Sequence, residues 1–254
     1  MKRKILSILL LILSTFLIIF AQLKHDVIYV GIDSNFWPMT YKSNNSYTGF
    51  DIDLANQVFN DADLTFKFEP INWNEKDELM SSGSIDCIWS GFSYNQERAN
   101  KYRLSTTYLK NNYVIVAPIS FTLDTLKEKS TSYKVGVHYK TSASYYFENS
   151  EYYNLPSTIL YYATINEALS ALNVNEIDFI ITDEIYATAA IKNELISYEV
   201  TNTSLGNELF SIAFSSDIDD ETYKRFNDAL KNSLSNGVAE SISEKWFNAN
   251  LLPQ

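Results

Sequence analysis

Two segments of the chain have the same sequence pattern, and they lead to charged side chains of opposite sign. Residues 83–98 contain a turn, an Ile-Asp pair, a short apolar run and then a cation, Arg98. Residues 175–183 contain the same turn, pair and apolar run but end on an anion, Asp183. A guanidinium binds a carboxylate through two parallel hydrogen bonds, and a carboxylate accepts hydrogen bonds from an ammonium. A site built from both residues would therefore suit a zwitterion.

Both residues also have ordinary structural explanations. Arg98 lies in a Gln-Glu-Arg-Ala run that is typical of a solvated surface helix. Asp183 directly precedes a predicted helix, and an aspartate in that place commonly caps the first turn. The duplicated context favours a ligand-binding role for Arg98, whereas Asp183 is able to cap the helix and to bind a ligand.

Further candidates follow from the ends of the predicted strands. In open α/β sheets, ligands bind beyond the carboxyl ends of the strands, where the loops converge. Applied to four predicted strand ends, this rule selects nine candidate ligand-binding residues: Asp33, Phe36, Ser90, Gly91, Ser93, Arg98, Thr141, Ser142 and Asp183. The short hydroxyls would bind a carboxylate, although each one taken singly is also a common cap or turn residue. Phe36 and Trp37, beside a proline, would form a stacking platform or pack within their loop.

Catalytic and metal chemistry is not indicated. The histidines are His25 and His138, and the position of the first near a predicted processing site argues against a two-histidine metal site. The single cysteine, Cys87, lies in a predicted buried strand, and no Ser/His/Asp or Gly-x-Ser-x-Gly arrangement is present. We therefore expect no catalytic residue, no metal and no cofactor. Asp86 and Asp178 precede their strands and are expected to be turn residues that point away from the site.

The elements that position these residues alternate between strand and helix. The predicted strands cover residues 27–32, 65–69, 87–89, 113–117, 134–137, 158–160, 179–182 and 210–214. The predicted helices begin near residues 50, 74, 142, 165, 184 and 219, a final helix follows near the C-terminus, and residues 33–48 are predicted to form a long loop. This alternation predicts an α/β fold with a mainly parallel sheet.

Two Rossmann-like lobes are expected, because residues 30–33 (VGID) and residues 135–138 (VGVH) are similar short strands that each end in a polar residue. The first lobe would comprise residues 22–117 and 204–254, and the second would comprise residues 118–203. The chain would then cross twice between the lobes, and two crossing strands make a hinge.

The N-terminus and the net charge restrict the location and the partners. Residues 1–4 carry the charges and residues 5–21 are apolar, which predicts an export signal over residues 1–21. We expect its cleavage, with a retained membrane anchor as the alternative, and no cysteine stands at the junction to carry a lipid. Cleavage removes three of the 20 basic residues and none of the 31 acidic ones, which changes the net charge from −11 to −14. Nucleic acid is therefore not an expected partner.

Four ordered motifs resemble those of a known family. Residues 30–36 (VGIDSNF), 49–55 (GFDIDLA), 83–98 and 245–247 (KWF) are similar, in this order, to the extracellular solute-binding proteins of amino-acid ABC transporters, the type II periplasmic binding proteins for polar amino acids. The resemblance covers about residues 26–248. It implies the two-lobed, periplasmic binding protein-like II fold.

The resemblance also implies roles for the candidates that would meet the α-carbon groups of an amino acid. The α-carboxylate would be bound by side chains from both lobes: Arg98, Ser93, Thr141 and Ser142. The α-ammonium would be bound by Asp183 together with a backbone carbonyl near Ser90 and Gly91.

The side chain of the amino acid would meet two residues of the first lobe. By the same resemblance, Phe36 would stack on it, and Asp33 matches a position that favours polar or cationic side chains. One residue departs from the family pattern, because Lys140 stands where a glycine is usual before Thr141. Its positive charge would instead favour an acidic amino acid, so both preferences stay open.

The expected function is capture of a free amino acid between the lobes and its delivery to the membrane permease of an ABC transporter. The protein would be an exported monomer in the periplasm, or at the outer face of the cytoplasmic membrane if the N-terminal helix is retained. The alternatives are a membrane-tethered amino-acid sensor and a cyclohexadienyl dehydratase-like lyase on the same scaffold. The lyase would need a general acid or base in the cleft, where His138 is the histidine candidate.

Overall fold

The computed structural model describes residues 27–117, 133–154, 156–192 and 199–253. The predicted export signal over residues 1–21 and the segment that follows residue 117 lie outside these ranges. Within the described ranges, none of the helices has both the length and the apolar character that a bilayer crossing requires.

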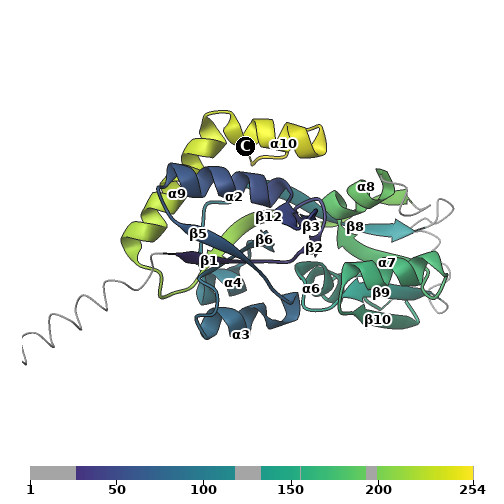
Figure 1. Cartoon of the computed structure of the whole chain (residues 1–254). Helices are drawn as coiled ribbons and strands as arrows, with labels where there is room; N and C mark the ends of the chain where they lie inside the picture. The colour runs from purple at the N-terminus through teal and green to yellow at the C-terminus, as the bar shows by residue number, and fades with distance from the viewer. Residues whose placement is uncertain (1–26, 118–132, 155, 193–198, 254) are drawn as a thin grey trace, which may run out of the picture.

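One sheet of nine strands runs through the described part of the molecule (Figure 1). Its strands are β1 (Ile28–Ile32), β5 (Phe66–Pro70), β6 (Cys87–Ser93), β7 (Arg103–Leu104), β8 (Leu109–Ala117), β9 (Lys134–His138), β10 (Thr158–Tyr162), β11 (Phe179–Asp183) and β12 (Glu199–Phe214). Their order across the sheet is β10-β9-β11-β8-β12-β6-β1-β5, and β7 pairs with β12. The chain therefore reaches the second half of the sheet after β8 and returns to the first half through β12.

The sheet is parallel in each half and antiparallel in the middle. β1 pairs in parallel with β5 and β6 in the first half, as β9 does with β10 and β11 in the second. β8 and β12 pair antiparallel along their length, from Leu109 opposite Phe210 to Ala117 opposite Glu199. The predicted α/β fold of two Rossmann-like lobes joined by two strands is confirmed, while the residue boundaries given for the lobes stay a prediction.

Both connecting strands begin earlier than predicted. β8 starts at Leu109 rather than residue 113, and β12 starts at Glu199 rather than residue 210. The added residues include Asn111, Asn112 and Glu208, whose polar side chains interrupt the apolar pattern by which a strand is predicted. Their backbones nevertheless pair with the facing strand, because ladder hydrogen bonds do not depend on side-chain polarity.

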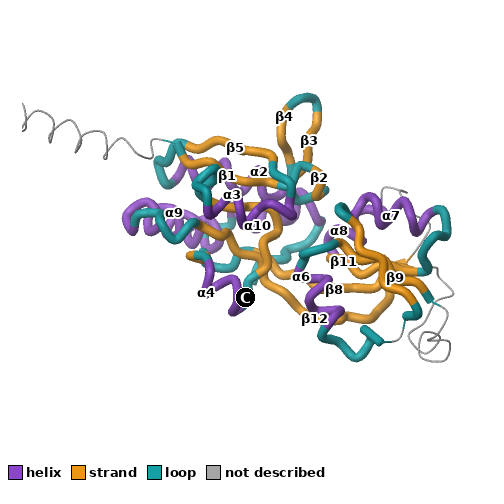
Figure 2. The backbone as a smooth tube through the Cα atoms, turned by 90° about the horizontal axis from the view of Figure 1, so that it is seen from below, coloured by secondary structure: helices purple, strands orange, loops and turns teal. Residues whose placement is uncertain are grey.

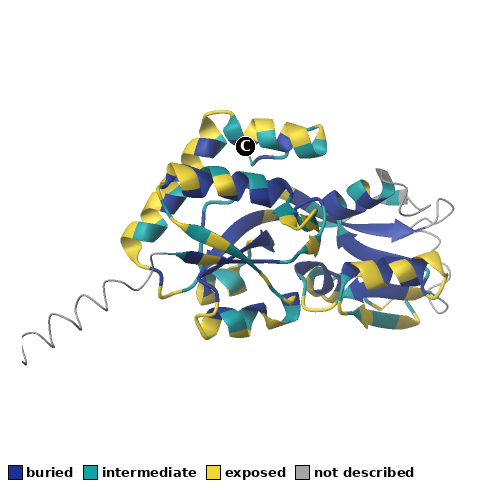
Figure 3. Ribbon diagram, viewed as in Figure 1, coloured by how far each residue is buried: buried dark blue, intermediate teal, exposed yellow. Residues whose placement is uncertain are grey.

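Helices cover both faces of the first half of the sheet (Figure 1). α2 (Phe50–Asp61), α9 (Asp220–Ser235) and α10 (Val238–Phe247) lie together on one face, and the 3-10 helix η1 (Trp73–Glu75), α3 (Lys76–Ser81) and α4 (Gln96–Lys101) belong to the other. The second half carries α6 (Ser142–Glu148), α7 (Ile165–Asn173) and α8 (Glu184–Lys192). The strands are mostly buried, whereas the helices alternate between buried and exposed faces (Figure 3).

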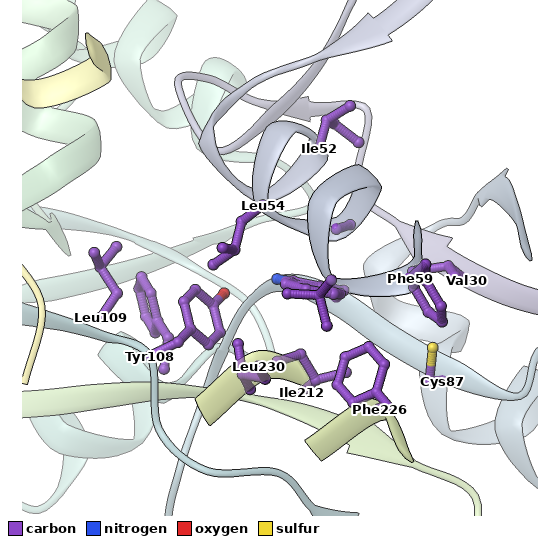
Figure 4. Close-up of a cluster of buried hydrophobic side chains, with 14 of the residues drawn as sticks. Val30, Ile52, Leu54, Phe59, Cys87, Tyr108, Leu109, Ile212, Phe226 and Leu230 are labelled. Atoms are coloured by element: carbon purple, nitrogen blue, oxygen red, sulfur yellow. The ribbon is translucent and has the colours of Figure 1, made fainter. Parts of the chain in front are cut away.

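Buried apolar side chains fill the space between α2, α9 and the sheet (Figure 4). Phe59 of α2 packs on Phe226 of α9, with ring centroids 5.0 Å apart. Cys87 of β6 is buried in the same cluster, and burial raises the pKa of its thiol. A protonated, enclosed thiol is a packing group rather than a nucleophile.

The internal repeat of the sequence is also a repeat of structure. Asp86 accepts a hydrogen bond from the N–H of Tyr29 in β1 (2.8 Å), and Asp178 accepts one from the N–H of Lys134 in β9 (2.7 Å). Each aspartate thus joins the turn before its own strand to the first residues of the neighbouring strand. Both carboxylates lie at the N-terminal edge of the sheet, at the opposite end of the strands from the nine candidates.

The prediction of a long loop over residues 33–48 is wrong. Three short strands, β2 (Asn35–Phe36), β3 (Thr40–Ser43) and β4 (Ser46–Thr48), form a separate small sheet. Asn44 and Asn45 join β3 to β4 with φ values of 46° and 67°, the left-handed conformation that two-residue hairpins require and asparagine tolerates. The hairpin of β3 and β4 projects from the molecule in Figure 2. The Asn-Asn pair is therefore a hairpin signal.

Candidate functional site

All nine candidate residues line one cavity between the two halves of the molecule, with a volume of about 40 Å³. The first half contributes Asp33, Phe36, Ser90, Gly91, Ser93 and Arg98, and the second contributes Thr141, Ser142 and Asp183. The lining also includes four residues outside the nine: Trp73, Tyr113, Ala143 and His138, the histidine named above for the lyase alternative. The carboxyl ends of β1, β6, β9 and β11 thus meet at one place, which is the arrangement that the strand-end rule describes.

Contacts within the first half hold Arg98 at the cavity. Asn95 caps α4 by accepting a hydrogen bond from the Arg98 N–H (2.8 Å). The guanidinium donates through Nη1 to the Ser93 carbonyl (2.9 Å) and lies 4.1 Å from the centroid of the Phe92 ring. Burial lowers the pKa of Arg98, but a guanidinium keeps its charge in proteins. α4 is therefore a surface helix whose arginine faces the cavity.

The Asp183 carboxylate belongs to a buried polar network at the connecting strands. Asn111 of β8 donates through Nδ2 to Asp183 Oδ1 (2.8 Å) and to Oε1 of Glu208 on β12. The side-chain oxygen of Asn111, Oδ1, accepts a hydrogen bond from the N–H of Ile185 (3.1 Å), so the side-chain amide provides a capping bond to α8. Burial, and then the nearby Glu208 carboxylate, raise the pKa of Asp183 well above its usual range.

The Ser90 hydroxyl joins β6 to the loop that follows β1. It accepts a hydrogen bond from the Asp33 N–H (3.2 Å) and lies 2.5 Å from the hydroxyl of Thr40. Thr40 is also hydrogen-bonded to the Asp33 carbonyl, at 2.5 Å. The Asp33 carboxylate accepts a hydrogen bond from the Asn35 N–H (2.9 Å), and burial raises its pKa. These bonds place the Asp33 side chain at the cavity.

Gly91 and Phe36 pack directly against each other. Gly91 has a φ of +55°, and a Cβ atom there would lie 2.4 Å from Phe36 Cε1, so the position requires glycine. Its N–H donates to Oδ2 of Asp51 (2.8 Å), a buried carboxylate whose pKa burial raises to about 7. Phe36 also stacks on Tyr186 of α8, with ring centroids 6.2 Å apart, and this contact joins the two halves.

The turn before α6 brings Thr141 and Ser142 to the cavity. Thr141 caps α6 by accepting a hydrogen bond from the Ser144 N–H (3.2 Å), and its hydroxyl donates to the His138 carbonyl (2.8 Å). Burial lowers the pKa of His138 to about 4, so its imidazole is neutral at pH 7. The second half therefore supplies hydroxyl groups and one carboxylate, but no cation, to the described lining.

Lys140 adopts the backbone conformation of the glycine that is usual at this position, and it does not line the cavity around the nine candidates. Its φ of +58° lies in the left-handed region that favours glycine, so a glycine-like turn precedes Thr141. The ammonium lies 5.4 Å from the centroid of the Tyr139 ring, and Lys140 lines a neighbouring cavity rather than the one around the nine candidates. The sequence-based expectation that Lys140 alters the charge of the pocket is therefore not supported.

Sequence reasoning missed three polar residues that the connecting strands bring to the site. Asn111, Tyr113 and Glu208 are buried, and the Tyr113 hydroxyl donates to Glu208 and lies 3.4 Å from Ser93 Oγ. Each lies within a strand rather than at its end, so the strand-end rule does not select it. The sequence pattern does not single out Glu208, because Asn207 precedes it and β12 contains several other polar residues.

The lining combines one guanidinium with two carboxylates, Asp33 and Asp183. A molecule that carries charges of both signs would find partners for each of them. In the ranges that the structure describes, no group of three or more His, Cys, Asp or Glu side chains is arranged to hold a metal ion. The arrangement is that of a binding site for a small charged molecule.

A family model matches almost all of the described chain. It is described as bacterial extracellular solute-binding proteins, family 3, and it matches residues 28–249. The arginine-binding extracellular protein ArtP of Bacillus subtilis (strain 168) is 23% identical over 223 residues, which cover 86% of this chain and 85% of ArtP.

Two solved structures share the fold closely. The substrate-binding protein of an ABC uptake transporter from Streptococcus pneumoniae, solved with bound histidine, is 32% identical with a TM-score of 0.82, over 90% of this chain and 95% of that one. Tv2483, solved with bound L-arginine, is 26% identical with a TM-score of 0.81, over 90% of this chain and 93% of that one. The similarity therefore extends over both halves of the molecule.

Proposed function

The chain belongs to the bacterial extracellular solute-binding proteins, family 3, and we propose that it captures a free amino acid between its lobes and delivers it to the permease of an ABC transporter. One observation carries the proposal: Arg98 and Asp183 line the same cavity from different halves of the molecule. An α-amino acid presents a carboxylate and an ammonium on one carbon, and each would meet a group of opposite charge. The histidine-bound and arginine-bound relatives support an amino acid as the ligand.

The α-carboxylate and the α-ammonium of the bound amino acid make most of the proposed contacts. The α-carboxylate is bound by side chains from both lobes: Arg98, Ser93, Thr141 and Ser142. The α-ammonium is bound by Asp183 and by a backbone carbonyl near Ser90 and Gly91. A molecule that lacks either charge leaves a buried protein charge unpaired, and that costs about 3–5 kcal/mol. Selectivity for amino acids follows from this cost.

The charge of the cavity favours a basic side chain on the amino acid. Once the zwitterion pairs with Arg98 and Asp183, the Asp33 carboxylate has no cation among the described residues that line the cavity. Lys140, which would favour an acidic side chain, lies outside this lining. A guanidinium or ammonium stacked along Phe36 would neutralise Asp33.

We propose no catalytic role for the cleft, since the family consists of solute-binding proteins. The lyase alternative needs a general acid or base at the ligand. His138 lines the cavity, but an imidazole whose pKa burial lowers to about 4 is a weak base at neutral pH. Binding without chemistry therefore accounts better for the arrangement.

A thermal-shift screen of the twenty L-amino acids tests the proposal. At 100 times its dissociation constant, a bound amino acid adds about 2.7 kcal/mol to the free energy of unfolding. We expect the largest rise in melting temperature with arginine, lysine or histidine. No rise with any of the twenty would contradict amino-acid capture, and a preference for aspartate or glutamate would contradict the role given to Asp33.

The family is extracellular, and for this chain we propose export, removal of residues 1–21 and a monomeric binding protein. A monomer suffices because one chain lines the cavity from both sides. Mass spectrometry of the native N-terminus tests the removal. A mature start near Gln22 fits a released protein, whereas a start at Met1 would favour the membrane-tethered alternative.

A further inference from the structure

A second buried carboxylate stands beside the proposed ammonium site. Glu208 lies on β12 and is only 5% exposed. Its Oε1 accepts a hydrogen bond from Asn111 Nδ2, and the same nitrogen donates to Asp183 Oδ1 (2.8 Å). Because one amide nitrogen serves both carboxylates, Asp183 and Glu208 are close neighbours.

No cation of the described chain lies in ion-pair contact with this pair, although the Arg98 guanidinium is near enough to Glu208 to interact with its charge. Among the residues that the structure describes, no lysine or arginine forms an ion pair with Asp183 or Glu208. The Arg98 guanidinium donates to the Ser93 carbonyl (2.9 Å). The Tyr113 hydroxyl donates to Glu208, and burial raises its pKa, so it stays neutral. The pair is thus two acids held by neutral donors.

Two neighbouring buried carboxylates do not both ionise unless a cation joins them. Burial and the Glu208 charge raise the pKa of Asp183, which agrees with this rule. An ammonium carries three N–H donors and a positive charge, so it can satisfy both carboxylates at once. A proton and an ammonium are therefore alternative partners for the same pair.

We propose that Asp183 and Glu208 share one proton while the cleft is empty, and that the ammonium of the bound amino acid replaces this proton. The proposal rests on the amino-acid capture proposed above. The amino acid arrives with all three ammonium protons, the O–H bond of the pair breaks, and one proton passes to the solvent. Glu208 and Asn111 stand behind Asp183 rather than in the lining of the ligand cavity. They line a second cavity of about 1050 Å³, bounded by α8 and α10, which provides a route for the proton.

This exchange makes binding depend on pH. Because the complex has lost a proton that the empty protein holds, a higher pH favours binding, and the affinity rises up to tenfold per pH unit below the pKa of the pair. The dependence ends above that pKa, where the empty pair has already lost its proton. A single ionised aspartate at the ammonium would produce no such slope near neutral pH.

Carbon-13 NMR of side-chain carboxyl groups tests the pair in the unliganded protein. The signals are assigned with the Asp183→Asn and Glu208→Gln variants. We expect one carboxyl of the pair to titrate well above the usual range, and Asp183 to titrate at a lower pH in Glu208→Gln than in the wild type. Titration of both groups in their usual range would overturn the proposal, whether or not an amino acid binds.

Calorimetry with L-arginine, in buffers of different ionisation enthalpy, counts the protons released on binding. At a pH where the empty pair is protonated, we expect close to one proton per arginine for the wild type and markedly fewer for Glu208→Gln. Glu184→Gln is the matched control, because Glu184 follows Asp183 in the chain but accepts its hydrogen bond from Asn112 (2.5 Å). This control should release as many protons as the wild type.

The two measurements separate the exchange from the function on which it rests. Arginine binding without proton release would overturn the exchange and leave amino-acid capture standing. A failure of all twenty amino acids to bind would contradict amino-acid capture, and with it the exchange, while the NMR titration would still decide whether the empty pair holds a proton.

Discussion

Arg98 donates to the Ser93 carbonyl and lies over the Phe92 ring, and neither contact neutralises its charge. A ligand carboxylate would do so, and truncating one member of a buried charge pair costs about 2–5 kcal/mol. We therefore expect Arg98→Ala to weaken amino-acid binding about 30-fold or more, measured by calorimetry. Its melting temperature should stay near that of the wild type, because alanine keeps the backbone N–H that Asn95 caps and the side chain makes one hydrogen bond, to the Ser93 carbonyl.

Arg103→Ala is the matched control for this prediction. Arg103 lies over the Tyr223 ring (3.8 Å) and pairs with the exposed Asp220 (2.6 Å), and it is not part of the cavity lining. Its loss should leave the affinity unchanged. Unchanged affinity in Arg98→Ala would contradict the proposed carboxylate site.

Asp51 makes the stability of the fold depend on pH. Burial raises the pKa of this carboxyl to about 7, whereas an aspartate in an unfolded chain titrates near about 3.9. Between these values the folded state holds a proton that the unfolded state has released, so the Asp51 contribution to the free energy of unfolding falls as the pH rises from about 4 to about 7. Asparagine removes the ionisation and still accepts the hydrogen bond from the Gly91 N–H.

Asp51→Asn should therefore gain stability relative to the wild type as the pH rises. We expect a relative gain of about 2–3 kcal/mol between pH 5 and pH 8, measured by urea unfolding at each pH. Asp61→Asn, at the exposed end of the same helix, should show no such gain. An equal difference between Asp51→Asn and the wild type at both pH values would contradict the raised pKa.

At the scale of elements, helix α2 depends on the backbone of Gly49. This residue precedes the helix with a φ of +135°, and a Cβ atom would lie 2.1 Å from the Met39 carbonyl oxygen. A backbone oxygen cannot turn aside as a side chain can, so Gly49→Ala forces the helix away from β3. We expect a loss of about 3 kcal/mol or more in the free energy of unfolding, measured with urea.

Gly83→Ala separates the steric cost from the conformational cost. Gly83 also has a positive φ, +71°, but a Cβ atom there would have no described atom within 4 Å. Only the backbone strain of an L-residue in this region applies, about 1 kcal/mol. Equal losses in Gly49→Ala and Gly83→Ala would show that the contact with Met39 is unimportant.

Helix α10 is joined to α2 by two of the motifs that predicted the family. Asp53 of α2 accepts hydrogen bonds from Lys245 Nζ (2.6 Å) and from the indole Nε1 of Trp246 (2.7 Å). In the sequence, the motifs at residues 49–55 and 245–247 matched the family only in their order along the chain. The fold explains the pairing, because the C-terminal helix returns to the first lobe and packs on α2 and α9 (Figure 1).

At the scale of the whole molecule, the small cavity implies that the lobes move. At about 10–15 Å³ for each water, its 40 Å³ holds about three water molecules, and an amino acid is several times larger. The lobes must therefore separate to admit a ligand, and β8 and β12 are the described strands that run between them. The stacking of Phe36 on Tyr186 breaks when the two halves separate.

Small-angle scattering should detect this motion. A compact chain of this length has a radius of gyration of about 18 Å, and we expect the empty protein to exceed the value that it reaches with a saturating amino acid. A ligand shifts the balance toward the closed form only through its additional contacts there. Arg98→Ala, at the same concentration of the amino acid, should show no contraction. Binding by the wild type with an unchanged radius of gyration would contradict closure around the ligand.

The sequence by itself determined the alternation of strands and helices, the duplicated plan and the polar groups at the strand ends. These features follow from local periodicity and from the rule that parallel strands present their carboxyl ends at one edge. For this reason Arg98 and Asp183 could be selected before their distance in space was known. The hairpin of β3 and β4 was also marked locally, by Asn44 and Asn45, but the signal was missed.

Only the tertiary structure decided which polar groups surround Asp183 and where the charge of Lys140 lies. Asn111 meets Asp183 and Glu208 across 72 and 97 residues of sequence, and no local pattern encodes such a separation. The meeting depends on the register of β8 against β11 and β12, which the packing of both lobes sets together. The position of Lys140 in the chain does not show where its charge lies, because the backbone turn at this residue decides that the ammonium lies near the Tyr139 ring.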